Sequence, residues 1–178
     1  GILLAGYATG ATHGYIFIRH GHDGTIERAK EAVRQAGELG ILGNSIFGSD
    51  FDFQVEVALT GDSYVAGEET ALMDSIEGKR AMPRFKPPFP AQFGAFGRPT
   101  TVNNTETLAS LPLILRKGAD WFMNLGTEGS GGSKIFSVSG HVQKPGNYEV
   151  TLGTPFRELL ELAGGSIPGR ALKAVIPG

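Results

Sequence analysis

The chain has 178 residues, 40% of them hydrophobic and 19% charged, a composition typical of a globular protein that buries a core. Its 16 basic and 18 acidic residues leave a net charge of −2, so no positive field favours nucleic acid or an anionic lipid surface. It contains no cysteine, which excludes a disulfide framework, a thiolate zinc site and a cysteine-ligated iron–sulfur cluster within this sequence.

The length and the ends of the sequence set the expected domain organisation. No apolar run approaches the ~20 residues of a membrane-spanning helix, so direct membrane insertion is not expected. The sequence begins without Met and stops at "AVIPG", in the middle of an apolar pattern. We therefore expect a segment of a longer protein, with one domain of ordinary size and a smaller second one.

The first third of the sequence predicts an α/β arrangement. Residues 2–8 are small and apolar and suit the last turns of a buried helix, and residues 15–19 form a β-rich apolar run between glycines. Apolar residues at helical spacing and a terminal glycine predict a helix over 24–40. Residues 51–59 alternate apolar and polar side chains, as a strand does. This order predicts a βαβ unit with two parallel strands.

The middle of the sequence predicts two helices on either side of a long loop. One helix begins near Gly67 and ends near residue 76, and the second begins at Asn103 or Asn104 as its N-cap. A further short helix is expected over 119–126. The loop over 77–101 is rich in Pro and Gly, and connections of this length are usually functional or disordered. Its four phenylalanines argue against disorder, because disordered tracts are poor in aromatic residues.

The last part of the sequence predicts a β-grasp-like module after a linker at 126–134. Strands are expected over 134–142 and 147–153, joined by a turn. A helix over 154–165 follows, with Thr154 as N-cap and Pro155 as its first residue, and a third strand over 171–178 completes the pattern. The predicted domains are therefore residues 1–131 and residues 132–178.

The stretch "GDSYVAGEETALMDS", residues 61–75, is the first candidate site. A strand that turns into a helix through glycines brings free backbone N–H groups and the positive helix end together, which favours an anion. Glu68 and Glu69 bring negative charge to the same place. Either both carboxylates simply stabilise the helix end, or one caps the helix while the other faces a cleft and accepts from a neutral donor such as a carboxamide.

Two further stretches could bind a ligand, and each also has a purely structural explanation. In "RFKPPFP" (84–90), prolines hold Lys86 and Phe89, so that a phenyl face could stack on a ring and a lysine could meet a phosphate; otherwise the aromatics cover the core. In "PTTVNNTET" (99–107), Asn103 and Asn104 either cap the next helix or divide capping and hydroxyl binding between them. The four histidines do not predict a metal site. No G-x-S-x-G, GxGxxG or GxxxxGK[ST] motif occurs, so a hydrolase triad, a standard dinucleotide fingerprint and a P-loop are not indicated.

Taken together and in this order, these stretches resemble a known family. The run "GDSYVAGEETALMDSIEGKRAMPRFKPPFPAQFGAFGRPTTVNN" closely resembles the NADH-binding, FMN-carrying flavoprotein subunit of respiratory complex I and the related diaphorase subunits of NAD-linked hydrogenases and formate dehydrogenases. The upstream "GYATGATHGYIFIR" and "FGSDFDFQVEV" are similar to the same family. The downstream "SGHVQKPGNYEVTLGTPFRELLELAGG" resembles its β-grasp domain of the soluble-ligand-binding type.

The resemblance implies a role for particular residues. Four residues are implied to line the FMN and NADH cleft, with Glu69 as the catalytic carboxylate near the nicotinamide: Tyr64, Gly67, Glu68 and Glu69. The K-P-P-F motif implies that Lys86 and Phe89 are cofactor-binding residues, with the phenyl ring as part of the adenine-stacking surface. The T-x-N-N motif implies that three residues hold FMN: Thr101, Asn103 and Asn104. The implied reaction is hydride transfer from NADH to FMN, followed by one-electron steps to iron–sulfur clusters.

The resemblance also implies partners and a location. The expected partners are the iron–sulfur subunits of a membrane-associated respiratory complex, with the chain peripheral on the cytoplasmic face of the cell membrane, or on the matrix side in a mitochondrion. A 4Fe-4S cluster is implied for the complete protein, but this chain carries no ligand for it. A hydrogenase or formate dehydrogenase diaphorase, and a non-catalytic assembly fragment, are the alternatives.

This chain also departs from the family pattern. Asp62 and Ser63 replace a glycine-containing turn, and Ala66 replaces a cysteine. We expect the glycine-rich segment that receives FMN to precede residue 1, and therefore expect this chain alone to hold FMN weakly.

Overall fold

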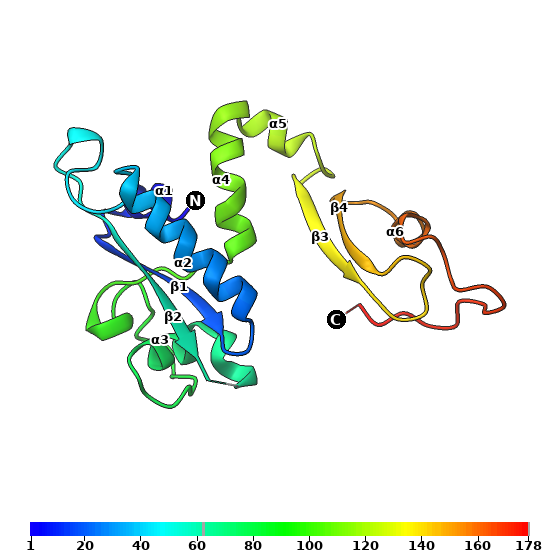
Figure 1. Ribbon diagram of the computed structural model, residues 1–178, viewed down its shortest axis with the longest axis horizontal. Coiled ribbons are helices and arrows are strands. Elements are labelled where there is room, and N and C mark those ends of the chain that lie inside the picture. Colours follow the sequence, from blue (N-terminus) through cyan, green and yellow to red (C-terminus); the bar gives the residue numbers. More distant parts are fainter. Residues whose placement is uncertain (62, 178) are drawn as a thin grey trace. The chain divides into compact units, whose positions relative to one another are not determined.

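The computed structural model describes residues 1–61 and 63–177 (Figure 1). The chain divides into two compact units, Gly1–Leu111 and Pro112–Gly178. Helix α4 (Thr105–Lys117) begins in the first unit and ends in the second. The domain boundary between residues 131 and 132 that the sequence suggested stays a prediction.

The first unit is built on the predicted βαβ arrangement. Strands β1 (His13–Arg19) and β2 (Gln54–Thr60) are parallel, in a register that runs from His13 opposite Gln54 to Arg19 opposite Thr60. Helix α2 (Asp23–Glu38) makes the crossover and lies across the strand pair, and the short helix α1 (Ile2–Thr9) precedes β1 (Figure 1). The α/β class and the parallel pair are therefore confirmed.

The core of this unit forms around Phe53, which is 1% exposed. Ile46 and Val55 are buried with it, and partly buried apolar side chains from α1, β1 and α2 pack against the three. Gly6 of α1 is required here, because a Cβ atom at this position would lie 2.4 Å from the Phe53 ring. Helix α1 thus packs directly on the first residues of the sheet.

Short helices follow β2. The 3₁₀-helix η2 (Tyr64–Gly67) leads into α3 (Glu69–Ile76), so the helix that the sequence predicted near Gly67 begins two residues later. Two further 3₁₀ turns, η1 (Ile46–Gly48) and η3 (Ala95–Gly97), lie in the connections before β2 and before α4. Asn104 caps α4, because its Oδ1 accepts from the Glu106 N–H at 2.8 Å.

The second unit holds a small antiparallel sheet. Helix α5 (Ala119–Met123) precedes strands β3 (Ser133–Val138) and β4 (Gly146–Thr151), which pair from Ser133 opposite Thr151 to Val138 opposite Gly146. Helix α6 (Phe156–Leu162) follows and buries Leu159.

Two details predicted for this unit are wrong. Residues 171–177 are exposed and form no strand, because no described strand pairs with them and a strand needs a partner for its backbone groups. Pro155 takes the N-cap position of α6. Thr154 does not cap the helix, since its hydroxyl donates to the Thr151 carbonyl at 2.7 Å and so closes the preceding turn instead.

Candidate functional site

The candidate site lies after the carboxyl end of β2. Open parallel sheets commonly bind ligands at this edge. Thr60, the last residue of β2, is 4% exposed, and its hydroxyl accepts from the Ser75 hydroxyl of α3 at 2.9 Å. This contact fixes the last turn of α3 against the end of the strand.

Glu68 caps α3 with its own side chain. Its Oε2 accepts from the backbone N–H groups of Thr70 and Ala71, each at 3.0 Å, and from the Thr70 hydroxyl. The hydroxyl bond, the two backbone bonds and the charge of Lys86 lower the pKa of Glu68 below its ordinary value. Glu68 is therefore an ionised cap, which matches the structural explanation of this carboxylate.

Glu69 is used differently. Its Oε1 forms an ion pair with Nζ of Lys86, which comes from the loop that follows α3, and Lys86 Nζ also lies 3.7 Å from Oε1 of Glu68. All three side chains are about one third exposed. The Glu69 bond, and then the charges of both carboxylates, raise the pKa of Lys86. In this structure Glu69 faces a cation; a contact with a neutral carboxamide stays a prediction.

The other predicted residues on this side of the sheet are open to solvent. Tyr64 is fully exposed, and a Cβ atom at Gly67 would meet no atom within 4 Å. Phe89 is 54% exposed, and its N–H donates to the Gln92 side-chain oxygen at 3.3 Å. The phenyl ring of Phe89 is thus available and does not cover the core.

Thr101, Asn103 and Asn104 stand at the start of α4. Thr101 and Asn103 are exposed, and Asn104 is the helix cap. The loop from Phe89 to Thr101 closes on itself, because the Thr100 N–H donates to the Pro90 carbonyl at 2.9 Å. In the part of the chain that the structure describes, no hydrogen bond or ion pair joins these three residues to the Glu68–Glu69–Lys86 cluster. The structure thus brings together three of the predicted site residues by direct contact.

A second ionic cluster, which the sequence patterns did not predict, lies beside the first. The Arg84 guanidinium donates to Asp74 Oδ1 through Nε at 2.9 Å and through a second nitrogen, and it lies 3.3 Å from Glu77 Oε2. Lys79 also binds Glu77. Asp74 lies in α3 and Glu77, three residues later, is the C-cap of that helix; two acids at this spacing are the signal that could have found the cluster.

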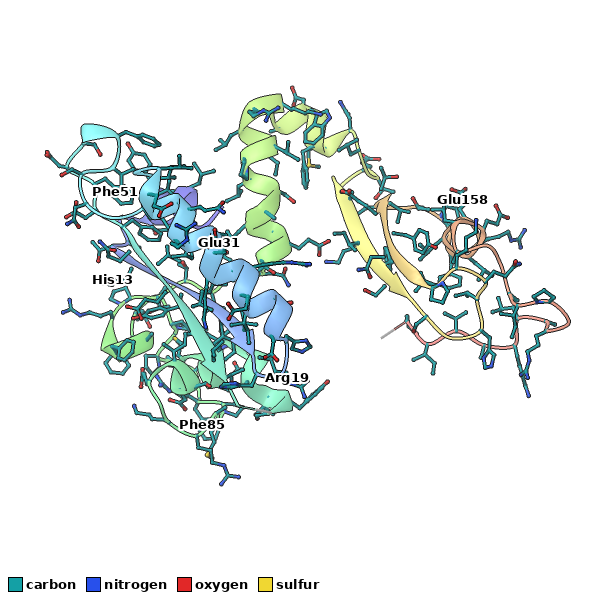
Figure 2. The ribbon with its side chains drawn as sticks, viewed as in Figure 1. His13, Arg19, Glu31, Phe51, Phe85 and Glu158 are labelled. Atoms are coloured by element: carbon teal, nitrogen blue, oxygen red, sulfur yellow. The ribbon has the colours of Figure 1, made fainter. Side chains whose placement is uncertain are left out.

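A pocket of about 730 Å³ opens next to this second cluster. Its walls are mostly apolar and come from α3, the Pro-rich loop and η3; they include Met73, Phe85, Phe93 and Phe96. Phe85 is 98% exposed and stands at the outer end of the loop (Figure 2). Three of the four loop phenylalanines therefore line an open pocket, whereas the structural explanation expected them to cover the core.

Three further expectations concern Asp62, metal-binding side chains and membrane-spanning helices. Asp62, a departure from the family pattern, lies outside the described residues. Among the described residues, no group of three metal-binding side chains is found. No helix in the described ranges has both the length and the apolar character to cross a membrane.

Comparison with known families assigns this architecture to a class. Residues 1–113 match the Nuo51 FMN-binding domain, and residues 135–177 match the SLBB domain. The chain therefore belongs to the Nuo51 FMN-binding domain family. The resemblance drawn from the sequence, and the β-grasp-like module of the soluble-ligand-binding type after it, are confirmed.

Individual relatives narrow the comparison. The chain is 48% identical to an NADH-quinone oxidoreductase subunit of Rhizobium meliloti, over all of this chain and 42% of that protein. It is also 48% identical to the NADP-reducing hydrogenase subunit HndC of Solidesulfovibrio fructosivorans, over 98% of this chain and 36% of that protein. A crystal structure of NAD+-reducing [NiFe]-hydrogenase in the H2-reduced state superposes with a TM-score of 0.82 at 35% identity, covering 93% of this chain and 28% of the other. The chain thus spans about two fifths of the curated relatives it matches.

Proposed function

We propose that this chain forms the NADH-facing part of a flavoprotein subunit that oxidises NADH by hydride transfer to FMN, within an NADH:quinone oxidoreductase of the complex I type. The observation that carries the proposal is the Glu68–Glu69–Lys86 cluster after β2, in a chain of the Nuo51 FMN-binding domain family. Relatives that are named as NADH-quinone oxidoreductase subunits match the whole of this chain and support the same activity.

The residues of the cluster fit a flavin and a nicotinamide. A bound FMN would supply the electron chemistry, accepting a hydride from NADH and releasing electrons singly to iron–sulfur clusters. This chain offers partly exposed carboxylates for N–H donors, a lysine for phosphate oxygens, and asparagine amides for sugar hydroxyls. The open space at Gly67 leaves room for a ring to approach the backbone.

Each side chain then has a defined task. Glu69 would accept from the nicotinamide carboxamide and so fix the face of the ring, which is orientation and not proton transfer. Lys86 would bind the diphosphate of NADH, and Phe89 would stack on the adenine. Glu68 would hold the start of α3 in place with Oε2, while its Oε1 would line the cleft with Tyr64. Thr101, Asn103 and Asn104 would hold FMN from the start of α4.

The proposal includes partners and a place in the cell. The chain has no cysteine, so the iron–sulfur ligands would come from elsewhere in the complete protein and from partner subunits. We propose that the flavoprotein is peripheral, on the cytoplasmic face of a membrane-bound complex, or on the matrix side in a mitochondrion. Quinone would then be the acceptor of the whole complex, and the complex would be a translocase.

The substitution Glu69→Gln in the complete flavoprotein tests the proposal. Gln keeps the size of the side chain but removes the charge, and hydrogen bonds to charged groups are the stronger ones, so we expect kcat/KM for NADH to fall about tenfold. The measurement is steady-state NADH oxidation with an artificial electron acceptor, together with stopped-flow flavin reduction. Glu27→Gln on the exposed face of α2 is the matched control. Unchanged NADH affinity and hydride-transfer rate in Glu69→Gln would show that the assigned role is wrong.

A diaphorase subunit of a hydrogenase is the second candidate. It is favoured by the match to the NADP-reducing hydrogenase subunit HndC and to the NAD+-reducing [NiFe]-hydrogenase structure. The hydride chemistry would be the same, and the acceptor would be a hydrogenase or a formate dehydrogenase. Co-purification of the complete protein separates the two candidates, because quinone reductase subunits or hydrogenase subunits would accompany it.

A further inference from the structure

The Pro-rich loop after α3 is held to that helix at Arg84, by its backbone as well as its side chain. The Arg84 N–H donates to the Thr70 hydroxyl at 2.8 Å, and Thr70 is 2% exposed. The guanidinium donates twice to Asp74, whose side chain is 13% exposed. Contacts on both sides of the Arg84 Cα fix the position and the direction of the chain at this residue.

The far limb of the same loop is held by Glu77, the C-cap of the same helix. Oε1 of Glu77 accepts from the Phe96 N–H at 2.8 Å, while its Oε2 lies 3.3 Å from the Arg84 guanidinium. Phe96 has a φ of 52°, a left-handed conformation that is unfavourable for a bulky side chain and needs support from its surroundings. Glu77 supplies a bond to that residue, so one nearly buried carboxylate joins both limbs of the loop.

Lys86 lies two residues after Arg84, and two residues of chain span at most about 7 Å. The Lys86 ammonium ends between Glu68 and Glu69, at the start of the helix whose next turns hold Arg84. Thr70 connects the two places directly, because its hydroxyl accepts from the Arg84 N–H and donates to Glu68.

We propose that Arg84 is a positioning residue, which sets Lys86 against Glu68 and Glu69 by clamping the loop to Asp74 and Glu77. The clamp does not itself contact a ligand in this assignment. Hydrogen bonds to Asp74 and Glu77, and the negative charges of these two acids, raise the pKa of Arg84, because they stabilise its positive charge. The guanidinium bonds to Asp74 Oδ1 through two nitrogens and also lies 3.3 Å from Glu77, and the compact ammonium of a lysine does not offer such a rigid fork of donors. The consequence for NADH binding rests on the function proposed for Lys86.

The first measurement follows Lys86 without any ligand. An amine-modifying reagent is applied at fixed pH to the complete protein, and the modification rate of Lys86 is read by peptide mass spectrometry. Loss of the clamp frees Lys86 from its ion pairs, and the ordinary strength of exposed pairs predicts that Arg84→Gln raises this rate about two- to fivefold. Arg84→Lys should give a smaller rise, and Arg80→Gln, an exposed position in the same loop, should give none. If Arg84→Gln does not fold, Arg84→Lys compared with Arg80→Lys decides the question in the same way.

The second measurement is a double-mutant cycle on NADH kinetics. If Arg84 acts through Lys86, Arg84→Gln raises KM for NADH with a smaller effect on kcat. The double variant Arg84→Gln/Lys86→Gln should then have the same KM and kcat for NADH as Lys86→Gln alone. Effects that multiply in the double variant would overturn the proposal, and so would an unchanged modification rate of Lys86. An increased modification rate with unchanged NADH kinetics would support the clamp and would instead count against the function proposed for Lys86.

Discussion

At the residue scale, the two carboxylate oxygens of Glu68 make different contacts, one with the start of α3 and one with the loop that follows this helix. Oε2 accepts from Thr70 and Ala71 as a helix cap, while Oε1 faces Lys86 at 3.7 Å. Glutamate is a less common cap than serine or aspartate, because its longer side chain must fold back to reach the N–H groups. The extra length is what allows the same carboxylate to meet a lysine from the next loop.

Substitutions at Glu68 should show how much its role as helix cap contributes to stability. We expect Glu68→Ala to lower the free energy of unfolding by about 1 kcal/mol at neutral pH, the usual cost of a lost cap, and Glu68→Asp to restore most of it. The folded-state pKa of Glu68 lies below its ordinary value of 4.5. Its stabilising contribution is therefore complete above 4.5 and is lost as the pH falls through the folded-state pKa.

Urea unfolding of the wild type and both variants at neutral and acidic pH checks this prediction. The gap between wild type and Glu68→Ala should narrow in acid. A gap that stayed constant down to the lowest pH would mean that the ionised carboxylate is not what stabilises the helix end.

At the scale of elements, the packing of α1 on the strand pair depends on close approach at glycine. Gly6 leaves no space for a Cβ atom beside the Phe53 ring, and a Cβ atom at Gly14 of β1 would lie 2.9 Å from the same ring. Gly37, near the end of α2, faces open space instead. The same substitution at two helix positions should therefore have opposite effects.

Gly6→Ala should lower the free energy of unfolding by about 1–3 kcal/mol, because it overpacks the core against Phe53. Gly37→Ala should raise it by about 0.5–1 kcal/mol, since alanine loses less backbone entropy on entering a helix. Thermal unfolding followed by far-UV circular dichroism measures both. Equal shifts of the two variants in one direction would contradict the packing described for α1.

Sequence patterns predicted most of these elements, since the periods of α2 and β2 and the caps around α4 are local signals. The clamp was not predicted, because Arg84 binds Asp74 and Glu77 ten and seven residues earlier in the chain. The pairing of Glu69 with Lys86 spans 17 residues and was missed for the same reason. The strand expected at 171–178 did not form, because a local apolar pattern says nothing about a pairing partner.

At the scale of the whole molecule, the match of the first unit to the FMN-binding domain does not make the chain a strong flavin binder by itself. Glu68, Glu69 and Lys86 together carry one net negative charge, and the lysine is already paired. A phosphate dianion gains little from such a group. The chain also spans about two fifths of its relatives, so much of their length has no counterpart here.

We therefore expect the 178-residue chain to bind FMN only weakly. Titration of FMN with the purified chain at micromolar concentration should leave flavin fluorescence almost unchanged, and the complete protein is the positive comparison. Saturable quenching by the chain alone would contradict this expectation and would show that these residues suffice to assemble the site.

The pairing of Lys86 with two carboxylates also bears on which ligands the site admits. A lysine that is already neutralised does not capture inorganic phosphate or another simple anion, because such an ion would have to separate the pair and leave the acids facing it. A ligand that brings both an anionic group and an N–H donor can replace the contacts of lysine and carboxylate in one exchange. The cluster would thus favour a ligand that carries both groups over a ligand that carries only one of them. A nicotinamide dinucleotide carries both, whereas its fragments do not.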